Sequence, residues 1–204
     1  MTSDYVKKYI SEAERECECE KHPEWLQQFF GSFAENLKGK VKEASTGNRN
    51  FITNAFSESL HHILPIKEKP KTEVSLSDFL EKEKLDSASE PFLNLLNKKR
   101  LDFHVRGKKG ELLIEFKTNM SFNDLAAAMV EMSLVKKYAP NIRTASLHLY
   151  PSSANVEGLR ELNKTTGAPL DFIWVLFPSK KLMIDDDAIK AIKAFRNDVA
   201  NAIN

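Results

Sequence analysis

Two carboxylates and one amine occur at a spacing that would bring them together within one short segment of the chain. Twelve residues separate Asp102 from Glu115, and Lys117 follows two positions later. Residues 101–117 alternate between apolar and polar types on both sides of a basic, glycine-flanked turn, which predicts two antiparallel strands. If this hairpin is symmetric about its turn, Asp102 faces Glu115 with Cβ atoms roughly 5 Å apart. Lys117 then lies on the same face.

This arrangement suits a divalent metal ion better than it suits a purely structural hairpin. Like charges directly opposed destabilise a strand pair by up to about 1 kcal/mol, and a bound cation removes that repulsion. Carboxylate oxygens with room for water are typical of magnesium sites. A lysine beside them can position or deprotonate an attacking water, or neutralise charge in a transition state. Together these groups suffice to hydrolyse a phosphodiester.

The other face of the predicted hairpin supports the same register. It is wholly apolar and would supply core side chains, namely Leu101, Phe103, Val105, Leu112, Ile114 and Phe116. The alternation is clean on both strands, as expected for strands with one polar and one buried face.

The first hundred residues are predicted to be mainly helical. Apolar residues recur at three-to-four spacing over 4–20, 24–41 and 50–64, which indicates three amphipathic helices. A linker is expected at 66–75. Two short helices are expected near 76–85 and 90–98.

The second half of the chain is predicted to contain the sheet. The pattern predicts strands over 100–106, 111–117, 145–150 and 171–177, and helices over about 122–138, 155–164 and 186–203. Ser121 is expected to be the N-cap of the first of these helices. Alternation of strands and helices after residue 111 favours right-handed crossovers and parallel pairing.

The predicted fold class is therefore α/β, with a mixed central β-sheet flanked by helices and a helical N-terminal part. Residues 1–97 would form the helical region and residues 98–204 the α/β core. At 204 residues, the two parts fit one compact domain.

Asp102, the twelve-residue spacer and the Glu115-Phe116-Lys117 tripeptide resemble the PD-(D/E)xK nuclease superfamily, in particular its restriction-endonuclease-like members. The resemblance covers about residues 88–177 and includes the order of strands and helices. It implies that Asp102 and Glu115 bind Mg²⁺ and that Lys117 acts with the attacking water. The motif name has a proline where this chain has Leu101.

The resemblance also implies a further acidic ligand, often placed on a helix that precedes the hairpin. Glu58 is the preferred candidate because its predicted helix is long enough to pack on the sheet, and it is included among the predicted catalytic residues. Glu90 is an alternative on the short helix after it. Glu131, on the helix after Lys117, is a third candidate.

Basic and polar residues around the hairpin predict contacts to a nucleic acid. A phosphate-contacting rim would consist of Lys99, Arg100, Arg106, Lys108 and Lys109. Polar side chains directly after Lys117 could hold a phosphate or contact a base edge, and these are Asn119, Ser121 and Asn123. Charged hairpin turns and helix capping explain the same residues without a ligand.

The two cysteines, Cys17 and Cys19, are too few for a disulfide framework. With His22 they suggest a soft-metal site, but two cysteines two apart on a helix point about 200° apart. They could bind the same ion only if the helix ended there, and a fourth ligand is missing. The sequence therefore does not favour a metal site at this position.

The overall charge and hydropathy of the chain limit the class of protein to which it can belong. The formal net charge is +1, divided into −4 over residues 1–97 and +5 over residues 98–204, so a polyanion would meet mainly the second half. A transmembrane run and a signal peptide are not evident in the sequence, which predicts a cytoplasmic protein.

The sequence thus predicts a Mg²⁺-dependent endodeoxyribonuclease, of the type II restriction endonuclease kind, that acts on double-stranded DNA as a homodimer. One alternative is a structure-selective repair or recombination nuclease of the same superfamily. Another is a non-catalytic binding or assembly module on the same scaffold.

Overall fold

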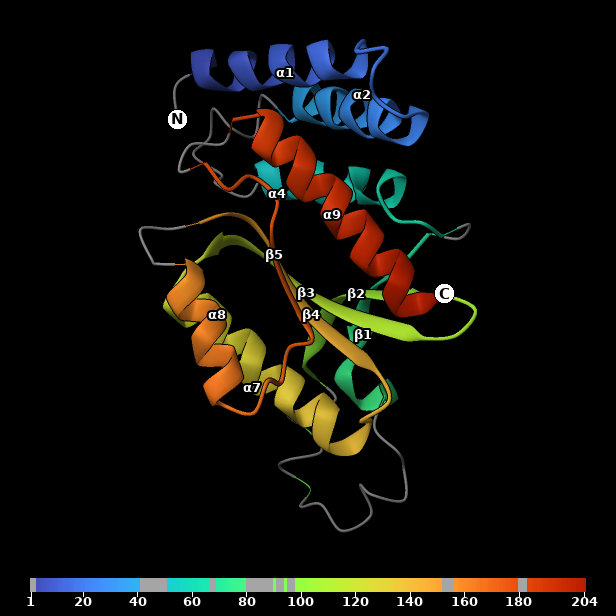
Figure 1. The fold of residues 1–204 in the computed structure, drawn as a ribbon, viewed down its shortest axis with the longest axis vertical. Coiled ribbons are helices and arrows are strands. Elements are labelled where there is room, and N and C mark those ends of the chain that lie inside the picture. Colours follow the sequence, from blue (N-terminus) through green and yellow to red (C-terminus); the bar gives the residue numbers. More distant parts are fainter. Residues whose placement is uncertain are drawn as a thin grey trace.

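The computed structural model describes residues 3–40, 51–66, 69–79, 90, 94, 98–151, 156–179 and 183–204. A five-stranded sheet in the order β1-β2-β3-β4-β5 lies at its centre, and helices cover both faces (Figure 1). The strands are β1 (Lys71–Ser75), β2 (Arg100–Arg106), β3 (Glu111–Met120), β4 (Arg143–Pro151) and β5 (Phe172–Val175).

The sheet is mixed. β1, β2 and β3 pair in antiparallel fashion, whereas β3, β4 and β5 are parallel neighbours. The parallel pairs are joined by helical crossovers, α7 (Phe122–Tyr138) between β3 and β4 and α8 (Val156–Thr165) between β4 and β5. This topology makes the hairpin an integral part of the sheet, with β3 at its centre.

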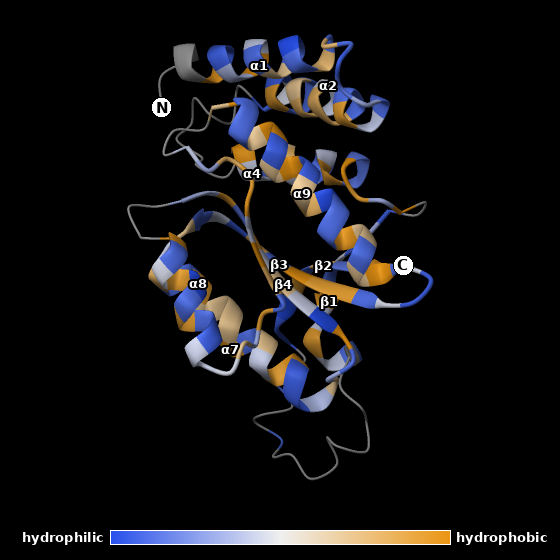
Figure 2. Cartoon of the chain, viewed as in Figure 1, coloured by the Kyte–Doolittle hydropathy of each residue, from blue (hydrophilic) through white to orange (hydrophobic). Residues whose placement is uncertain are grey.

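One face of the sheet is covered by α4 (Phe51–Ser59) and α9 (Asp186–Ile203). α2 (Glu24–Gly39) packs on α4, and α1 (Ser3–Cys17) packs on α2, farther from the sheet. A continuous cluster of buried side chains joins these helices to β2, β3 and β4. Aromatic contacts hold it together: Phe56 of α4 packs against Phe116 of β3 with ring centroids 5.5 Å apart. Figure 2 shows the apolar residues gathered on the strands and on the inward helix faces.

The opposite face is covered by α7 and α8. A second cluster of buried side chains contains Leu113 of β3, Leu125 and Met132 of α7, and Leu159 of α8. Ser121 caps α7 as predicted, because its hydroxyl accepts a hydrogen bond from the Asp124 amide at 3.2 Å.

The hairpin turn is braced by the end of α9. The Gly107 amide donates to the Gly110 carbonyl at 3.0 Å, and the Lys109 amide donates to the carbonyl of Ile203 at 3.0 Å. A methyl group at Gly107 would overlap Ile203. Glycine is therefore required at this position by the close approach of α9.

The predicted fold class is confirmed: an α/β fold with a mixed sheet flanked by helices and a helical N-terminal part. One prediction was wrong, because residues 71–75 form the edge strand β1 instead of a linker. This strand carries charges on its exposed side, so its composition resembles that of a loop. The division at residue 97 stays a prediction, and most of the helix expected at 90–98 lies outside the described residues.

A further difference concerns Leu101, which was expected to share a face with Phe103 and Val105. It belongs instead to the second cluster, together with Leu76. The Leu76 amide donates to the carbonyl of Lys99 at 3.0 Å, so the turn after β1 accompanies the start of β2 on that side. Within the described residues, no helix is long and apolar enough to cross a membrane.

Candidate metal-binding active site

The β2–β3 register places Asp102 beside Glu115. Strand pairing runs from Phe103 opposite Ile114 to Arg106 opposite Glu111, which is the predicted register. One residue further, the Asp102 carboxylate accepts a hydrogen bond from the Phe116 amide at 2.7 Å. Asp102 is thus fixed against the backbone between Glu115 and Lys117.

Glu115 and Lys117 form a close ion pair. The Lys117 Nζ donates to Glu115 Oε1 at 2.6 Å, and the Glu115 side chain is only 2% exposed. Glu115 Oε2 is buried and has no hydrogen-bond partner among the described residues. An ionised oxygen left this way is energetically unfavourable unless a cation reaches it.

Helix α7 adds a third acidic residue. Glu131 pairs with Lys99 at 2.6 Å, and Lys99 also lies 3.8 Å from Glu115 Oε1. Glu131 Oε2 is, like Glu115 Oε2, buried without a hydrogen-bond partner in the described part of the chain. The face of the sheet that carries Leu113 also carries Glu115, so α7 packs directly over the carboxylates.

The charges of this group perturb one another. Burial and the negative charge of Glu115 raise the pKa of Asp102 from 3.8 to about 6, against the opposing effects of the Phe116 amide and Lys117. Burial and the charge of Glu131 raise the pKa of Glu115, although Lys117 and Lys99 oppose this. Strong mutual perturbation of this kind is typical of functional sites.

Lys117 is held in its charged form. Burial by itself would lower the pKa of its ammonium group, but the hydrogen bond and charge of Glu115, with the charges of Asp102 and Glu131, outweigh burial and raise it. Lys117 and Lys99 therefore supply the positive charge that keeps three carboxylates in one place.

The donor set fits a hard divalent cation. All the converging ligands are carboxylate oxygens, which Mg²⁺ prefers, and two of these oxygens are buried without a partner among the described residues. Asp102 and Glu115 stay the predicted ligands of this ion. Glu131 is close enough to Glu115 to affect its pKa and is the acidic residue that the structure adds to them.

The other two candidates for the further acidic ligand lie elsewhere. Glu58 pairs with Lys40 at 2.9 Å, and its side chain is 52% exposed. Its helix α4 packs on the opposite face of the sheet from Glu115, which explains why the two do not meet. Glu90 is exposed, and its neighbours in sequence lie outside the described residues.

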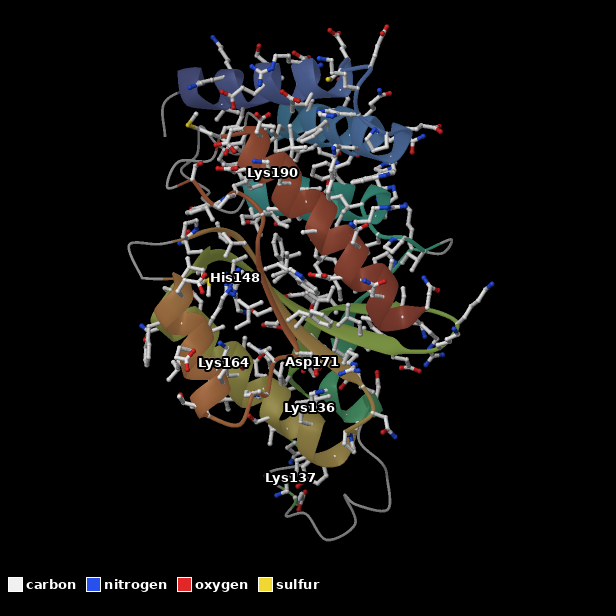
Figure 3. The ribbon with its side chains drawn as sticks, in the orientation of Figure 1. Lys136, Lys137, His148, Lys164, Asp171 and Lys190 are labelled. Atoms are coloured by element: carbon white, nitrogen blue, oxygen red, sulfur yellow. The ribbon has the colours of Figure 1, made fainter. Side chains whose placement is uncertain are left out.

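Strand β4 contributes two polar residues that sequence reasoning missed. Ser146 pairs with Glu115, and His148 pairs with Lys117. The His148 Nδ1 donates to the Asn119 carbonyl at 2.9 Å, so its Nε2 accepts from the Ser146 hydroxyl at 2.7 Å. Burial lowers the pKa of His148 to about 4, so the ring is neutral (Figure 3). The available signal was the polar alternation inside the apolar segment 145–150.

A third missed residue is Glu73 on the edge strand β1. Its neighbours Thr72 and Val74 pair with Phe103 and Leu101, so Glu73 lies across from Asp102. Its φ of 53° falls in the left-handed region, which is unusual for glutamate. Its charge contributes to the raised pKa of Asp102.

An open cleft lies at the carboxyl end of β3. Its volume is about 380 Å³. It is lined by Thr53, Asn54, Phe116, Lys117, Thr118, Asn119 and Asp124. Thr53 of α4 and Thr118 are joined by a hydrogen bond of 2.6 Å, so α4 borders the cleft. The cleft gives a ligand access to Lys117.

The predicted nucleic-acid contacts fall into two groups. In the first group, Arg100 is exposed at the start of β2, close to the carboxylates, and Asn123 is exposed at the start of α7. Ser121 is engaged as the N-cap of α7. Asn119 Oδ1 is buried without a partner among the described residues, and Lys99 is engaged with Glu131.

The second group lies at the other end of the strands. Arg106 pairs with Glu111 at 2.9 Å, and Lys108 and Lys109 are exposed in the turn. Glu111 lies six positions before Lys117 along β3, which corresponds to roughly 20 Å. The turn therefore cannot contact the same phosphate as Lys117.

Comparison with known proteins shows a likeness at the level of the fold. Neither the scan against protein-family models nor the search of curated proteins gives a match. Among solved structures, the type IIP restriction endonuclease Kpn2I is similar, with a TM-score of 0.50 and 10% sequence identity. The alignment covers 97% of this chain and 70% of that chain. The fold of this chain is therefore restriction-endonuclease-like.

The raised pKa of Asp102 predicts that Asp102→Asn stabilises the metal-free protein at pH 8. Because the folded-state pKa is about 6 and the ordinary value is 3.8, wild type loses stability as pH rises between these values. The amide avoids this loss and can still accept from Phe116. Urea unfolding in EDTA should show a gain of about 1–3 kcal/mol at pH 8. The gain should shrink near pH 4.5, and destabilisation at pH 8 would contradict the electrostatic explanation.

The placement of the acidic residues predicts that Glu131→Gln weakens binding of Mn²⁺, used as a stand-in for Mg²⁺. A loss of about 10–100-fold in affinity is expected, whether Glu131 binds the ion directly or orients its ligands. Glu58→Gln is the comparison, and it should bind Mn²⁺ as wild type does because its partner is Lys40. Titration followed by electron paramagnetic resonance measures both. Weaker Mn²⁺ binding by Glu58→Gln than by Glu131→Gln would instead identify Glu58 as the third acidic residue of the site.

Proposed function

We propose that this protein is a Mg²⁺-dependent endodeoxyribonuclease that hydrolyses phosphodiester bonds of duplex DNA, in the manner of a type II restriction endonuclease. The observation that carries the proposal is the convergence of Asp102, Glu115 and Lys117 on one hairpin. The restriction-endonuclease-like fold around them supports it, because Kpn2I has a similar fold and is a restriction endonuclease.

Each residue has a role that follows from its surroundings. Asp102 and Glu115 would hold Mg²⁺, which supplies a polarised phosphate and a more acidic water. Before an ion binds, Lys117 is held protonated, because the neighbouring carboxylates raise its pKa. It would therefore donate a hydrogen bond to the attacking water or to a phosphate oxygen, and stabilise the charge that develops there.

The DNA backbone would enter the cleft at the end of β3. Phe122 and Asn123 are exposed in the first turn of α7, where the helix dipole favours a phosphate. Lys108 and Lys109 would contact the backbone at a second place, since roughly 20 Å separates the two ends of the hairpin. This distance suits two contacts along one duplex.

A homodimer is proposed because cutting both strands requires two sites. Two-fold symmetry of the protein would match a pseudo-palindromic target. Dimer contacts are expected from the N-terminal helices and α9. A structure-selective nuclease of the same fold would use the same residues but prefer branched DNA.

A non-catalytic module is the less favoured reading. Three neighbouring carboxylates, two with buried oxygens lacking partners among the described residues, destabilise the metal-free fold. Such an arrangement is difficult to explain without a ligand that compensates for it.

The proposed function predicts that Asp102→Asn, Glu115→Gln and Lys117→Met each reduce plasmid cleavage in Mg²⁺ by about 100-fold or more. Initial rates of conversion of supercoiled plasmid measure this, with EDTA as the metal-free reference. Discrete fragments indicate sequence-selective cutting, and a preference for branched substrates indicates the structure-selective alternative. Residual activity equal to that of wild type in all three variants would falsify the site.

The matched control is Lys136→Met. Lys136 donates to Asp171 at 2.6 Å, and its side chain is 25% exposed compared with 28% for Lys117. Lys136 and Asp171 lie near each other in Figure 3. This variant loses an ion pair whose lysine is as buried as Lys117, so it reports the effect of losing such a lysine outside the site. Its rate per folded molecule should remain that of wild type.

The basic turn predicts a change in the salt dependence of DNA binding. The double variant Lys108→Gln/Lys109→Gln should reduce the slope of log K against log salt by about 2, since each lysine contact contributes roughly 1. Fluorescence anisotropy with duplex DNA in EDTA measures the slope.

The control for the turn uses two exposed lysines on other elements, Lys164 of α8 and Lys190 of α9 (Figure 3). Replacing both by glutamine makes the same change in net charge. The slope should then stay at the wild-type value. Equal effects of both double variants would show that the turn does not contact DNA.

A further inference from the structure

Three side chains with different donor atoms meet where α1 ends and the chain turns into α2. They are Glu16, Cys19 and His22, and one ligand atom of each lies within 4.8 Å of the others. The carboxylate, thiol and imidazole come from a segment of seven residues, at a spacing of three. This cluster lies apart from the carboxylates of the sheet, at the end of the molecule formed by α1 and α2 (Figure 1).

The end of α1 removes the geometric objection to a metal site here. The helix stops at Cys17, so Cys19 lies beyond it and is free of the helical spacing. Cys17 takes no part, because its Sγ points at α2, where a methyl group at Gly31 would come within 3.0 Å of it. The third ligand is Glu16, which is not the residue that the cysteine pattern indicated.

The backbone of the loop is fixed by hydrogen bonds. The His22 amide donates to the Cys19 carbonyl at 3.0 Å, which closes a turn between the two ligands. The Gln27 side chain of α2 donates to the carbonyls of Cys19 and His22 at 2.9 and 3.1 Å. A ligand loop held in this way loses little conformational entropy when it binds an ion.

The carboxylate of the cluster already has an outer partner. Glu16 is 8% exposed, and Arg15 donates to its Oε1 at 2.7 Å. The other oxygen, Oε2, lies 2.8 Å from His22 Nε2. An ion between Oε2 and Nε2 would replace that hydrogen bond, while Arg15 would keep Oε1 oriented. Such outer contacts are typical of metal-binding carboxylates.

We propose that Glu16, Cys19 and His22 bind one Zn²⁺ ion. Thiolate and imidazole select zinc over magnesium, and a carboxylate completes three protein ligands. Ligand atoms around tetrahedral zinc lie roughly 3.3–3.8 Å apart. Glu16 Oε2 and His22 Nε2, now 2.8 Å apart, would therefore open slightly, and the other ligand distances, which are within 4.8 Å, would close where they exceed this range, both through side-chain rotation. Water occupies the fourth position, because Cys19 is partly exposed.

The ion ties the end of α1 to the start of α2. It is independent of the proposed nuclease activity, since its ligands lie outside the sheet and its donor set differs from that of the Mg²⁺ site. Its effect is on the stability of the helical hairpin.

Cobalt titration of the whole protein tests the proposal. The protein is stripped of metal under reducing conditions and titrated with Co²⁺ in excess Mg²⁺, which occupies the carboxylate site. One equivalent of Co²⁺ should give a thiolate-to-cobalt charge-transfer band, and one equivalent of Zn²⁺ should remove it. Cys19→Ser should abolish the band, whereas the matched control Cys17→Ser should retain it.

Thermal unfolding provides a second measurement. Zn²⁺ at about 100-fold above its Kd should raise the midpoint of wild type by about 5–10 °C. The rise should disappear in His22→Gln, which keeps both cysteines, and circular dichroism verifies that each variant is folded. Failure of wild type to give the band, or a band that depends on Cys17 instead of Cys19, overturns the proposal. Loss of plasmid cleavage has no bearing on either readout.

Discussion

The electrostatic balance around Glu115 is the constraint on which the rest of the structure depends. A carboxylate buried in the central strand requires positive charge, and Lys117 supplies it at 2.6 Å. Asp102 and Glu131 add negative charge nearby, and Lys99 offsets part of it. Raised pKa values show that this compensation is incomplete in the metal-free protein. The fold must therefore hold the group together against its own repulsion, through elements anchored elsewhere.

Those anchors are apolar and lie on both faces of the hairpin. On one side, Phe116 packs against Phe56 of α4, and the end of α9 closes over Gly107. On the other side, α7 covers Leu113 and positions its own glutamate above the strand. Beside β3, the neutral ring of His148 binds the carbonyl of Asn119 and fixes the end of the strand. The carboxylates are thus held between packed elements, and Lys117 lines the cleft at the end of β3.

The local part of this arrangement could be predicted from the sequence, because it depends on the period of a strand and the symmetry of a hairpin. Alternation along residues 101–117 was sufficient for the register, and the cap at Ser121 followed from its residue type. That Glu131 is the acidic residue beside Asp102 and Glu115 was not predictable in the same way. Glu58 and Glu131 both lie on helices that bury apolar side chains against the sheet, and only packing decides which helix covers the polar face of the hairpin. Likewise, the sequence does not show which cysteine lies beside His22, because this depends on the residue at which α1 ends. Cys17 is the last residue of the helix, and Cys19 lies beyond it.

The same balance links metal-free stability to the proposed chemistry. In the metal-free protein, Lys117 pairs with Glu115 and Lys99 pairs with Glu131. The two lysines thus supply the positive charge that a divalent ion would otherwise supply. A bound ion would satisfy the carboxylates itself and free the Lys117 ammonium to turn toward the cleft that it lines. Lys117 would then be available to a phosphate only when the metal site is filled, although its ammonium group is charged in both states. Under the proposed function, this coupling makes one residue serve as a structural counter-ion before metal binding and as a hydrogen-bond donor to the reacting phosphate after it.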